Sequence, residues 1–374
     1  MGKVIQFKQK ENKNIYIILA ILIVVTLALV YINIVHGAYT KPLNLNNNTI
    51  MTIEDSGYIF KKYGNDIVAC GHEGLTAISK NGEIKWKVPF TTATPFMITN
   101  DKYIFCADLG GNQYSVFSSG RPLVTEKTPY EIITANINES GHYAVATKER
   151  GYKAQITVFD IEGRQIFAWH STKYHVLSLA VANNNKSMLV SVLDSDNTGG
   201  DAFKLLHFSF SKETPTEIES GENNLISSIT VSGNKFYAVG DTALYAYNEN
   251  GKKSFIIDYS GRTIQRYSIT DSEVLLALTK TSVEGYYGGS VVEIYTPSGS
   301  MRGSFEVDDE ITFLDTEQNK ILVNSPDGAY ILSGNGRLYG NLTFSNEVRE
   351  GLIFSGGKKL LLINGSNVNI YDSK

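Results

Sequence analysis

The chain has 374 residues, of which 42% are hydrophobic and 19% charged, and its formal net charge at pH 7 is −4. These values are ordinary for a folded protein and exclude an intrinsically disordered chain. The negative charge also argues against a general nucleic-acid binder, because neutralising phosphates requires a concentrated basic face. The 22 tyrosines, 17 phenylalanines and 33 glycines favour many strands joined by tight turns.

The first feature in chain order is an apolar run at the N-terminus. Residues 15–35 carry no charge, and at about 1.5 Å per residue a helix of this length spans roughly 31 Å, the thickness of a bilayer core. Lysines are concentrated before the run, so the positive-inside rule predicts a cytoplasmic N-terminus. We predict a single-pass cell-membrane protein with a cytoplasmic tail (1–14), a transmembrane helix (15–35), a polar linker (36–48) and an extracytoplasmic domain (49–374).

A cleaved signal peptide is the alternative interpretation of this run. The apolar region of a signal peptide is usually about 7–15 residues long, which is shorter than the run found here. The small-residue sequence before Ala38, Val-His-Gly, is also a poor cleavage site. We therefore expect an uncleaved anchor, with the linker holding the domain away from the membrane surface.

A glycine-containing turn between two strand-like runs recurs along the rest of the chain. In the first copy, GLTAISKNGEIKW, Gly82 follows an apolar run. Five similar copies follow, and two weaker ones lie around Lys212 and at the C-terminus. The markers are 37 to 49 residues apart, near positions 82, 120, 163, 212, 251, 299, 336 and 373.

This spacing is the period of propeller blades. Each unit contains strand, turn, strand, glycine turn and strand, which predicts a four-stranded antiparallel sheet. A helical solenoid would need amphipathic runs at a 3.6-residue spacing, and we find none. We predict an all-β, eight-bladed β-propeller, with seven blades as the alternative if one weak copy is an insertion. The last copy lacks a fourth strand, so we expect the segment Asn48–Glu54 (NTIMTIE) to supply it and close the ring.

Ala77, Gly82 and Trp86 resemble the tryptophan-docking repeat of WD40-like propellers, as found in pyrroloquinoline-quinone dehydrogenases and the outer-membrane assembly lipoprotein BamB. The copy departs from that pattern, because Ala77 and Gly82 are one residue closer together and Ser79 stands where aspartate is usual. The overall layout also resembles an uncharacterised family of membrane-anchored propellers in Gram-positive spore-formers, whose activity is not established. In later copies the tryptophan position holds Phe167, Phe255, Gly303 or Gly340.

The resemblance to quinone dehydrogenases would imply acidic metal ligands, a catalytic aspartate and a disulfide between adjacent cysteines. Here Cys70 and Cys106 occupy equivalent positions in successive blades. Packed sheets lie about 10 Å apart, so we expect two buried thiols on neighbouring sheets rather than side by side. No histidine spacing, nucleophile elbow or phosphate loop indicates a catalytic or metal site. We therefore predict no catalytic residues and no cofactor.

The longest predicted loops join the second and third strands of three blades. They are residues 148–153, 193–202 and 281–290, and in a propeller such loops emerge on one face, which we call the crown face. Exposed aromatic and charged side chains on loops are typical of binding surfaces, whereas the alternative is that glycine-rich loops drift without a function. The candidate partner-binding residues are Arg150, Tyr152, Asp194, Asp196, Asp201, Glu284, Tyr286 and Tyr287.

The second of these loops, DSDNTGGD, imitates the start of a calcium-binding EF-hand loop. Its twelfth position is Leu205 instead of the bidentate glutamate that completes such a site. We expect an ordinary polar loop, with calcium binding as the alternative.

Together these features predict a non-catalytic, membrane-anchored scaffold that binds envelope or membrane proteins or cell-wall polymer. One alternative is a carbohydrate-active or quinoprotein-like enzyme at the propeller mouth, with carboxylates such as Asp194, Asp201 or Glu284. Another is a ligand sensor that signals through a membrane partner, because the predicted cytoplasmic tail of 14 residues is too short for an output domain.

Overall fold

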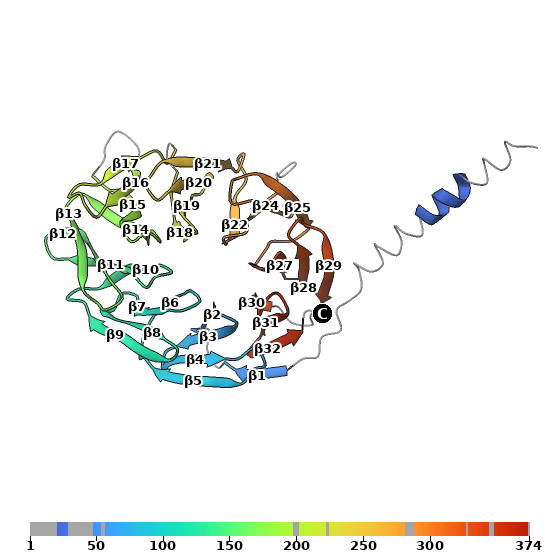
Figure 1. The fold of residues 1–374 in the computed structure, drawn as a ribbon, viewed down its shortest axis with the longest axis horizontal. Helices are drawn as coiled ribbons and strands as arrows, with labels where there is room; N and C mark the ends of the chain where they lie inside the picture. Colours follow the sequence, from blue (N-terminus) through green and yellow to red (C-terminus); the bar gives the residue numbers. More distant parts are fainter. Residues whose placement is uncertain are drawn as a thin grey trace, which may run out of the picture.

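The computed structural model describes residues 21–28, 48–53, 57–196, 202–221, 224–280, 288–326, 328–343 and 348–372. In these residues 32 strands form eight four-stranded antiparallel sheets. The sheets stand around one axis as the blades of a ring (Figure 1). The predicted all-β, eight-bladed propeller is thereby confirmed.

The strands of each blade run from the axis to the rim in chain order, and we call them first to fourth. Blade 1 is β2 (Ile59–Tyr63), β3 (Asp66–Gly71), β4 (Gly74–Ile78) and β5 (Ile84–Pro89); blade 2 is β6 (Pro95–Thr99), β7 (Ile104–Asp108), β8 (Gln113–Ser118) and β9 (Arg121–Lys127). Blade 3 is β10 (Ile132–Ile137), β11 (Tyr143–Glu149), β12 (Tyr152–Phe159) and β13 (Gln165–Ser171); blade 4 is β14 (Tyr174–Val181), β15 (Ser187–Asp194), β16 (Phe203–Ser209) and β17 (Thr216–Ile218). Blade 5 is β18 (Ser228–Ser232), β19 (Lys235–Val239), β20 (Ala243–Asn248) and β21 (Lys253–Asp258); blade 6 is β22 (Ile264–Ile269), β23 (Val274–Thr279), β24 (Ser290–Tyr295) and β25 (Met301–Val307). Blade 7 is β26 (Phe313–Glu317), β27 (Lys320–Ser325), β28 (Gly328–Ser333) and β29 (Leu338–Thr343). Blade 8 is β30 (Val348–Phe354), β31 (Lys359–Asn364), β32 (Asn367–Asp372) and β1 (Asn48–Thr52).

Blade 8 closes the ring by combining the two ends of the domain. The strand β1 pairs antiparallel with β32, so that Asn48 lies opposite Ile370 and Thr52 opposite Asn367. The predicted closing strand is confirmed. Side chains from both ends share one buried cluster with blade 1, in which Ile53, Phe60 and Val368 are almost fully buried. Closure therefore buries apolar surface and also pairs the edge of the last sheet.

A glycine occupies the turn between the third and fourth strands in six blades. Its φ lies between 75° and 88°, which strains any residue with a Cβ. In five of these turns, all but that of Gly120, the side chain three positions before the glycine accepts a hydrogen bond from the backbone N–H that follows the glycine. Asp160 does so through Oδ1 at 2.9 Å, and Ser79 through Oγ at 3.1 Å. A serine thus performs the turn role for which aspartate is usual. The glycines are Gly82, Gly120, Gly163, Gly251, Gly299 and Gly336.

Two of these glycines make room for an aromatic ring of the preceding blade. A Cβ on Gly120 would lie 2.8 Å from the indole of Trp86, and one on Gly299 would lie 2.6 Å from the ring of Phe255. Both aromatic residues stand four positions after the glycine of their own blade. The aromatic residue of one blade therefore docks on the turn of the next, as the tryptophan-docking resemblance implies.

The first strands have no neighbouring strand on the axial side, so their backbone groups need other partners. Polar side chains of the preceding blade supply some of them. Among the described residues, three backbone N–H groups donate such bonds: Val181 N to Asn136 Oδ1 (3.0 Å), Ile229 N to Ser178 Oγ (3.0 Å) and Ile353 N to Asp315 Oδ2 (2.9 Å).

The two cysteines correct one prediction. Both are free and buried, as expected, but they share the cluster between blades 1 and 2, and their thiols lie within hydrogen-bonding distance of each other. The expectation that Cys70 and Cys106 would not lie side by side was wrong, because side chains of facing sheets interdigitate across the gap between the backbones. Burial raises the pKa of the Cys106 thiol well above its usual value.

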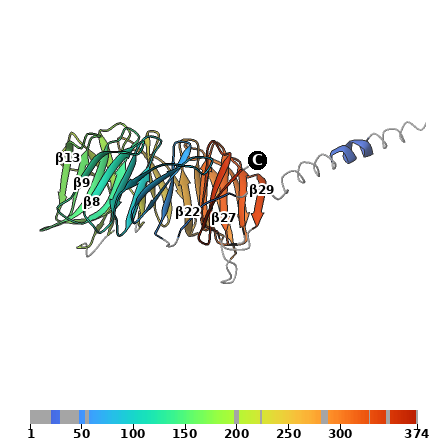
Figure 2. The ribbon, with the colours of Figure 1, turned by 90° about the horizontal axis from the view of Figure 1, so that it is seen from below.

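The described part of the N-terminal region is a short helix over residues 21–28 (Figures 1 and 2). Within it the Thr26 hydroxyl donates to the Leu22 carbonyl oxygen at 2.7 Å. Among the described residues, no helix has the length and apolar character needed to cross a membrane. The remainder of the predicted span over 15–35, the predicted tail and residues 36–47 of the predicted linker lie outside the described residues.

Candidate functional site

The ring has two faces that differ in how their connections are built (Figure 2). Connections between second and third strands, and those between blades, emerge on the crown face. Connections between first and second strands, and between third and fourth strands, emerge on the opposite side, which we call the turn face. Because β1 is antiparallel to β32, both Asn48 and Asp372 lie at the turn face.

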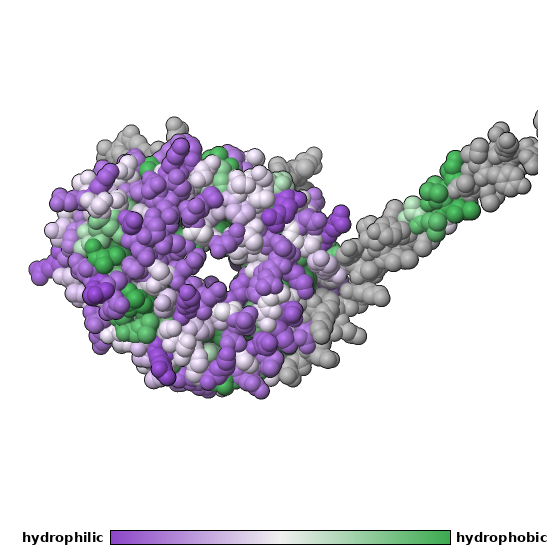
Figure 3. Space-filling model, viewed as in Figure 1, coloured by the Kyte–Doolittle hydropathy of each residue, from purple (hydrophilic) through white to green (hydrophobic). Residues whose placement is uncertain are grey.

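The axial channel is where the alternative enzyme hypothesis places its site, and here it is a cavity of about 690 Å³. Its opening is visible in the space-filling view (Figure 3). The described residues that line it are mainly small polar and aliphatic side chains, and Glu139 is the single carboxylate among them. Glu139 already accepts a hydrogen bond from the Asn183 amide at 2.9 Å. This lining does not offer the pair of carboxylates that glycoside hydrolysis requires.

Two predicted residues, Arg150 and Tyr152, lie together on the crown face of blade 3. The Tyr152 side chain is 44% exposed, and its ring centroid lies 5.2 Å from that of His170. His170 in turn donates Nδ1–H to Glu149 Oε2 at 2.6 Å. Arg150 is exposed and makes no ion pair or hydrogen bond with the described residues. An arginine and a tyrosine are thus presented to solvent from a loop held by packed neighbours.

A cleft of about 540 Å³ opens beside this loop, between blades 2 and 3. Arg150 lines it together with Pro129 and Tyr130, whose ring is 37% exposed. Lys148 and Glu131 form an ion pair at its edge. Arginine and tyrosine are the side chains most enriched at the centres of protein interfaces. The arrangement suits a projecting group of a partner protein.

The loop of blade 4 differs from its prediction. Asp194 is only 3% exposed, so the expectation of an exposed charge was wrong at this position. It is the last residue of β15, where it pairs in register with Tyr174, and Lys173 Nζ lies 3.0 Å from its Oδ2. Asp196 is exposed and accepts a hydrogen bond from Lys153 Nζ at 2.6 Å.

These pairs bear on the calcium interpretation of the same loop. Two of the carboxylates needed for it, Asp194 and Asp196, are already engaged by lysines. No group of three or more His, Cys, Asp or Glu side chains suited to a metal ion occurs in the described ranges. The other four predicted residues, Asp201, Glu284, Tyr286 and Tyr287, lie outside the described residues.

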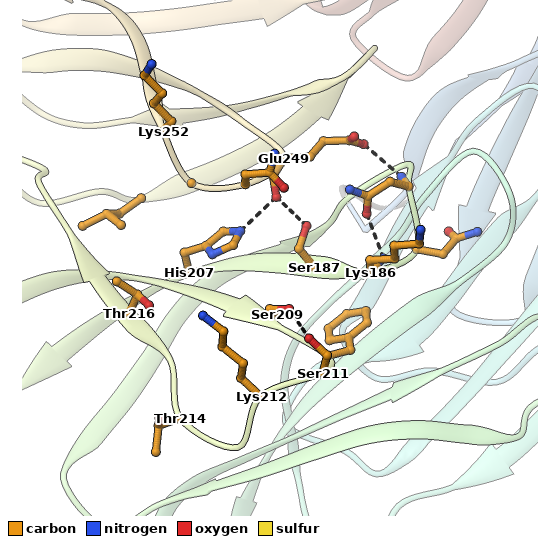
Figure 4. Close-up of a pocket in the computed structure, with 16 residues that line it drawn as sticks. Lys186, Ser187, His207, Ser209, Ser211, Lys212, Thr214, Thr216, Glu249 and Lys252 are labelled. Atoms are coloured by element: carbon orange, nitrogen blue, oxygen red, sulfur yellow. Dashed lines mark hydrogen bonds between the residues drawn. The ribbon is translucent and has the colours of Figure 1, made fainter.

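A second cleft, which the sequence reasoning missed, lies on the turn face between blades 4 and 5 (Figure 4). Its volume is about 620 Å³, and three turns from the two blades surround it. Each turn contributes one exposed lysine: Lys186, Lys212 and Lys252. The hydroxyl groups of its lining belong to Ser187, Ser209, Ser211, Thr214 and Thr216.

His207 and Glu249 form the buried side of this cleft, which we call the lysine cleft. His207 is 9% exposed, and its Nε2–H donates to the Glu249 carbonyl oxygen at 2.9 Å (Figure 4). Burial lowers the pKa of His207; the bond to the Glu249 carbonyl opposes this, and the Lys212 ammonium lowers the pKa further. The Glu249 carboxylate, the single acidic group of the lining, accepts from the Asn184 backbone N–H at 2.9 Å. The residues that line the cleft therefore include three lysines and one glutamate.

At the cleft, the outer edge of blade 4 departs from the repeat. The connection over residues 210–215 contains no glycine, and β17 has only three residues. The Phe210 ring instead lies 5.2 Å from that of Phe167 in blade 3. The sequence signal that could have revealed the cleft is this weakest repeat copy, around Lys212.

Several solved structures share this architecture. The C-terminal WD40 domain of Sif2 superposes with a TM-score of 0.60 at 13% identity, covering 90% of this chain and 99% of that one. BamB from Moraxella catarrhalis gives a TM-score of 0.54 at 14% identity, with 88% and 98% covered. The computationally designed protein Ika8 gives 0.61 at 14% identity, with 87% and 99% covered. At these identities the likeness shows the fold alone.

A search of curated proteins returned no match. The sequence profile of one family, described as "Family of unknown function (DUF5711)", matches residues 39–371.

Proposed function

The chain belongs to this family of unknown function, DUF5711, and from that premise we propose that it is a membrane-anchored, extracytoplasmic propeller that binds another envelope protein without catalysis. The observation that carries the proposal is the crown cleft between blades 2 and 3, where Arg150 and Tyr130 are exposed at one concave surface beside Tyr152. A rigid ring that presents such residues on supported loops is a suitable docking platform.

The anchor in this proposal is supported by the sequence of the first residues. The uncharged run over 15–35 has the length of a bilayer core, and the lysines before it favour a cytoplasmic N-terminus. The closing strand β1 starts at Asn48, so the chain between the run and the ring is short. This arrangement keeps the propeller near the outer surface of the membrane.

Thiol labelling in intact cells tests the topology. Both native cysteines are fully buried, so they give little background with a membrane-impermeant maleimide. A cysteine introduced at the exposed position Asn81 should be labelled, whereas one introduced at Lys8 should be labelled only after the cells are lysed. Labelling of both positions, or of neither, in intact cells would contradict the proposed orientation.

Site-specific photocrosslinking tests the docking surface. A photoreactive amino acid at Tyr152 should capture a defined envelope protein in intact cells. The matched control is Tyr339 on β29, which is 48% exposed but lies on the rim of blade 7. Arg150→Ala should weaken the capture from Tyr152. Identical products from Tyr152 and Tyr339, or none from Tyr152, would overturn the proposal.

A further inference from the structure

We infer that the lysine cleft between blades 4 and 5 binds the phosphate group of an anionic ligand. The lysine cleft lies on the turn face and the crown cleft lies on the opposite face, so this inference does not depend on the proposed docking function. It concerns a different surface, a different chemistry and different residues.

The charge of the cleft is the first argument. Lys186, Lys212 and Lys252 come from three separate turns, yet they border one cavity of about 620 Å³ (Figure 4). The only carboxylate of the lining, Glu249, is held by the Asn184 backbone N–H. The resulting excess of positive charge occurs in a chain whose formal net charge is −4. Lysines gathered around a concavity attract anions more strongly than the same lysines dispersed over a surface.

The hydrogen-bonding groups of the cleft are the second argument. The lysine ammoniums and the Thr214 hydroxyl have protons to donate, and the Ser209 and Ser211 hydroxyls, which share one hydrogen bond of 2.9 Å, keep one proton between them. A phosphate group has only acceptor oxygens at neutral pH when it is a diester, and mostly acceptor oxygens when it is a monoester. These donors are more than the Glu249 carboxylate can accept from. Lysine binds phosphate as a point charge, so the site does not need the planar geometry of an arginine pair.

The size of the cleft defines the ligand class more closely. A volume of about 620 Å³ falls within the range of small-molecule sites and is larger than one phosphate group needs. The half-buried Phe210 and Ile218 form part of the wall, so the ligand also has carbon-bound surface. A phosphate ester of a small polyol fits this combination of charge, donors and apolar wall.

The position of the cleft allows two sources for such an ester. The turn face also carries Asn48, from which the chain continues toward the predicted anchor. A phospholipid headgroup and a soluble polyol phosphate present the same chemistry to the lysines. The experiment below has separate arms for the two sources.

His207 provides a spectroscopic readout at the site. Its imidazole is buried against the cleft and is close enough to Lys212 for that ammonium to lower its pKa. A bound phosphate reverses the local field, so the pKa of His207 should rise. His142 is a matched control, because it is also on the turn face, is also lowered in pKa by burial, and belongs to blade 3.

The full chain, held in nonionic detergent micelles and labelled with ¹³C-histidine, would be titrated with sodium phosphate and with glycerol 3-phosphate at constant ionic strength. We expect a saturable shift of the His207 resonance and none of the His142 resonance. Sodium acetate at equal charge should produce a much smaller shift. The lipid arm places the full chain in nanodiscs of phosphatidylcholine with or without phosphatidylglycerol. A His207 shift in the phosphatidylglycerol discs assigns the headgroup as ligand, and a shift with glycerol 3-phosphate alone assigns a soluble ester.

Lysine variants provide the specificity test. Lys186→Ala, Lys212→Ala and Lys252→Ala should each weaken binding by about two- to five-fold, as expected for exposed ion pairs, and the triple variant should abolish it. Lys102→Ala, an equal charge change on the turn face of blade 2, should have no effect. Unchanged melting temperatures would show that the variants fold. Absence of a His207 shift with both phosphate compounds and in the phosphatidylglycerol discs, or an equal shift in the triple variant, would overturn the inference.

Discussion

The outer edges of blades 1 and 4 are built from the same repeat and have opposite outcomes. In blade 1 the turn with Gly82 leads into the six-residue strand β5, and Trp86 docks on Gly120 of blade 2. In blade 4 the glycine is missing, β17 has three residues, and Phe210 turns back toward blade 3. The first edge borders a cavity of about 650 Å³ between blades 1 and 2, which Trp86 lines, and the second borders the lysine cleft of about 620 Å³.

Both junctions hold a cavity, so the glycine turn and its docking partner do not decide whether a cavity is present. The charge of the lining differs: three carboxylates and two lysines line the cavity between blades 1 and 2, whereas one carboxylate and three lysines line the lysine cleft. Departures from local rules in a repeat are therefore candidates for function.

The largest effect is expected at a glycine on which an aromatic ring docks. Gly120→Ala should lower the free energy of unfolding by about 3 kcal/mol, because the new Cβ meets the Trp86 ring at 2.8 Å and the φ of 75° strains an L-residue. Gly110→Ala is the matched control, because Gly110 has a φ of 78° but no atom within 4 Å of its would-be Cβ. It should cost about 1 kcal/mol. Urea denaturation measures both, and equal losses would show that docking does not hold the junction.

A smaller effect is expected from the corresponding aromatic residue of blade 4. Phe210→Ala should cost about 1–2 kcal/mol, which is less than a fully buried phenylalanine, because Phe210 is only half-buried against Phe167. Its loss should leave the lysines in place. Thermal melting and urea curves measure the change, and a loss as large as that of Gly120→Ala would mean that blade 4 is sealed by this contact.

The turn itself should contribute less again. Ser79→Ala removes the acceptor for Glu83 N–H and should cost about 1 kcal/mol or less. Ser79→Asp supplies the usual acceptor of the repeat and should match or exceed wild-type stability. If Ser79→Asp were less stable than Ser79→Ala, the hydrogen bond from Glu83 N–H would not explain why a hydrogen-bond acceptor occupies position 79.

The smallest effect concerns acidification of the lysine cleft. Burial holds the pKa of His207 below its usual value of about 6.5, so near this pH the unfolded chain binds a proton that the folded protein does not. The free energy of unfolding should therefore fall as the pH drops below about 6.5. His207→Gln keeps a side-chain N–H for the Glu249 carbonyl oxygen and should lose less stability between pH 7.5 and pH 5.5. Equal losses in wild type and variant would contradict this assignment. Burial also lowers the pKa of His142, but His142 is present in both proteins and so contributes equally to both losses.

Much of the ring was predictable because its determinants are local and repeated. Gly82 and its counterparts mark turns that need a positive φ, and that requirement is encoded within five residues. The closing strand was predictable for a related reason, since an incomplete last copy requires a partner and the segment Asn48–Glu54 has the pattern of a strand.

The binding features depend on separations that no local pattern encodes. The lysine cleft forms because three turns, spread along the chain between residues 184 and 252, meet at the junction of blades 4 and 5. The burial of Asp194 depends on its register opposite Tyr174, and the contact of Cys70 with Cys106 depends on how two sheets interdigitate. Sequence spacing placed each of these residues on a strand or loop, but not against its neighbours.

Ring closure has a mechanical consequence for a tethered protein. The strand β1 forms the seam of the ring and is the first described strand of the chain, and its starting residue Asn48 lies opposite Ile370. Tension on the N-terminal segment is therefore transmitted first to the seam, where it pulls one strand away from β32. A force applied to the N-terminal segment therefore acts first on the pairing of β1 with β32, so the ring opens at blade 8 before any other blade is disturbed.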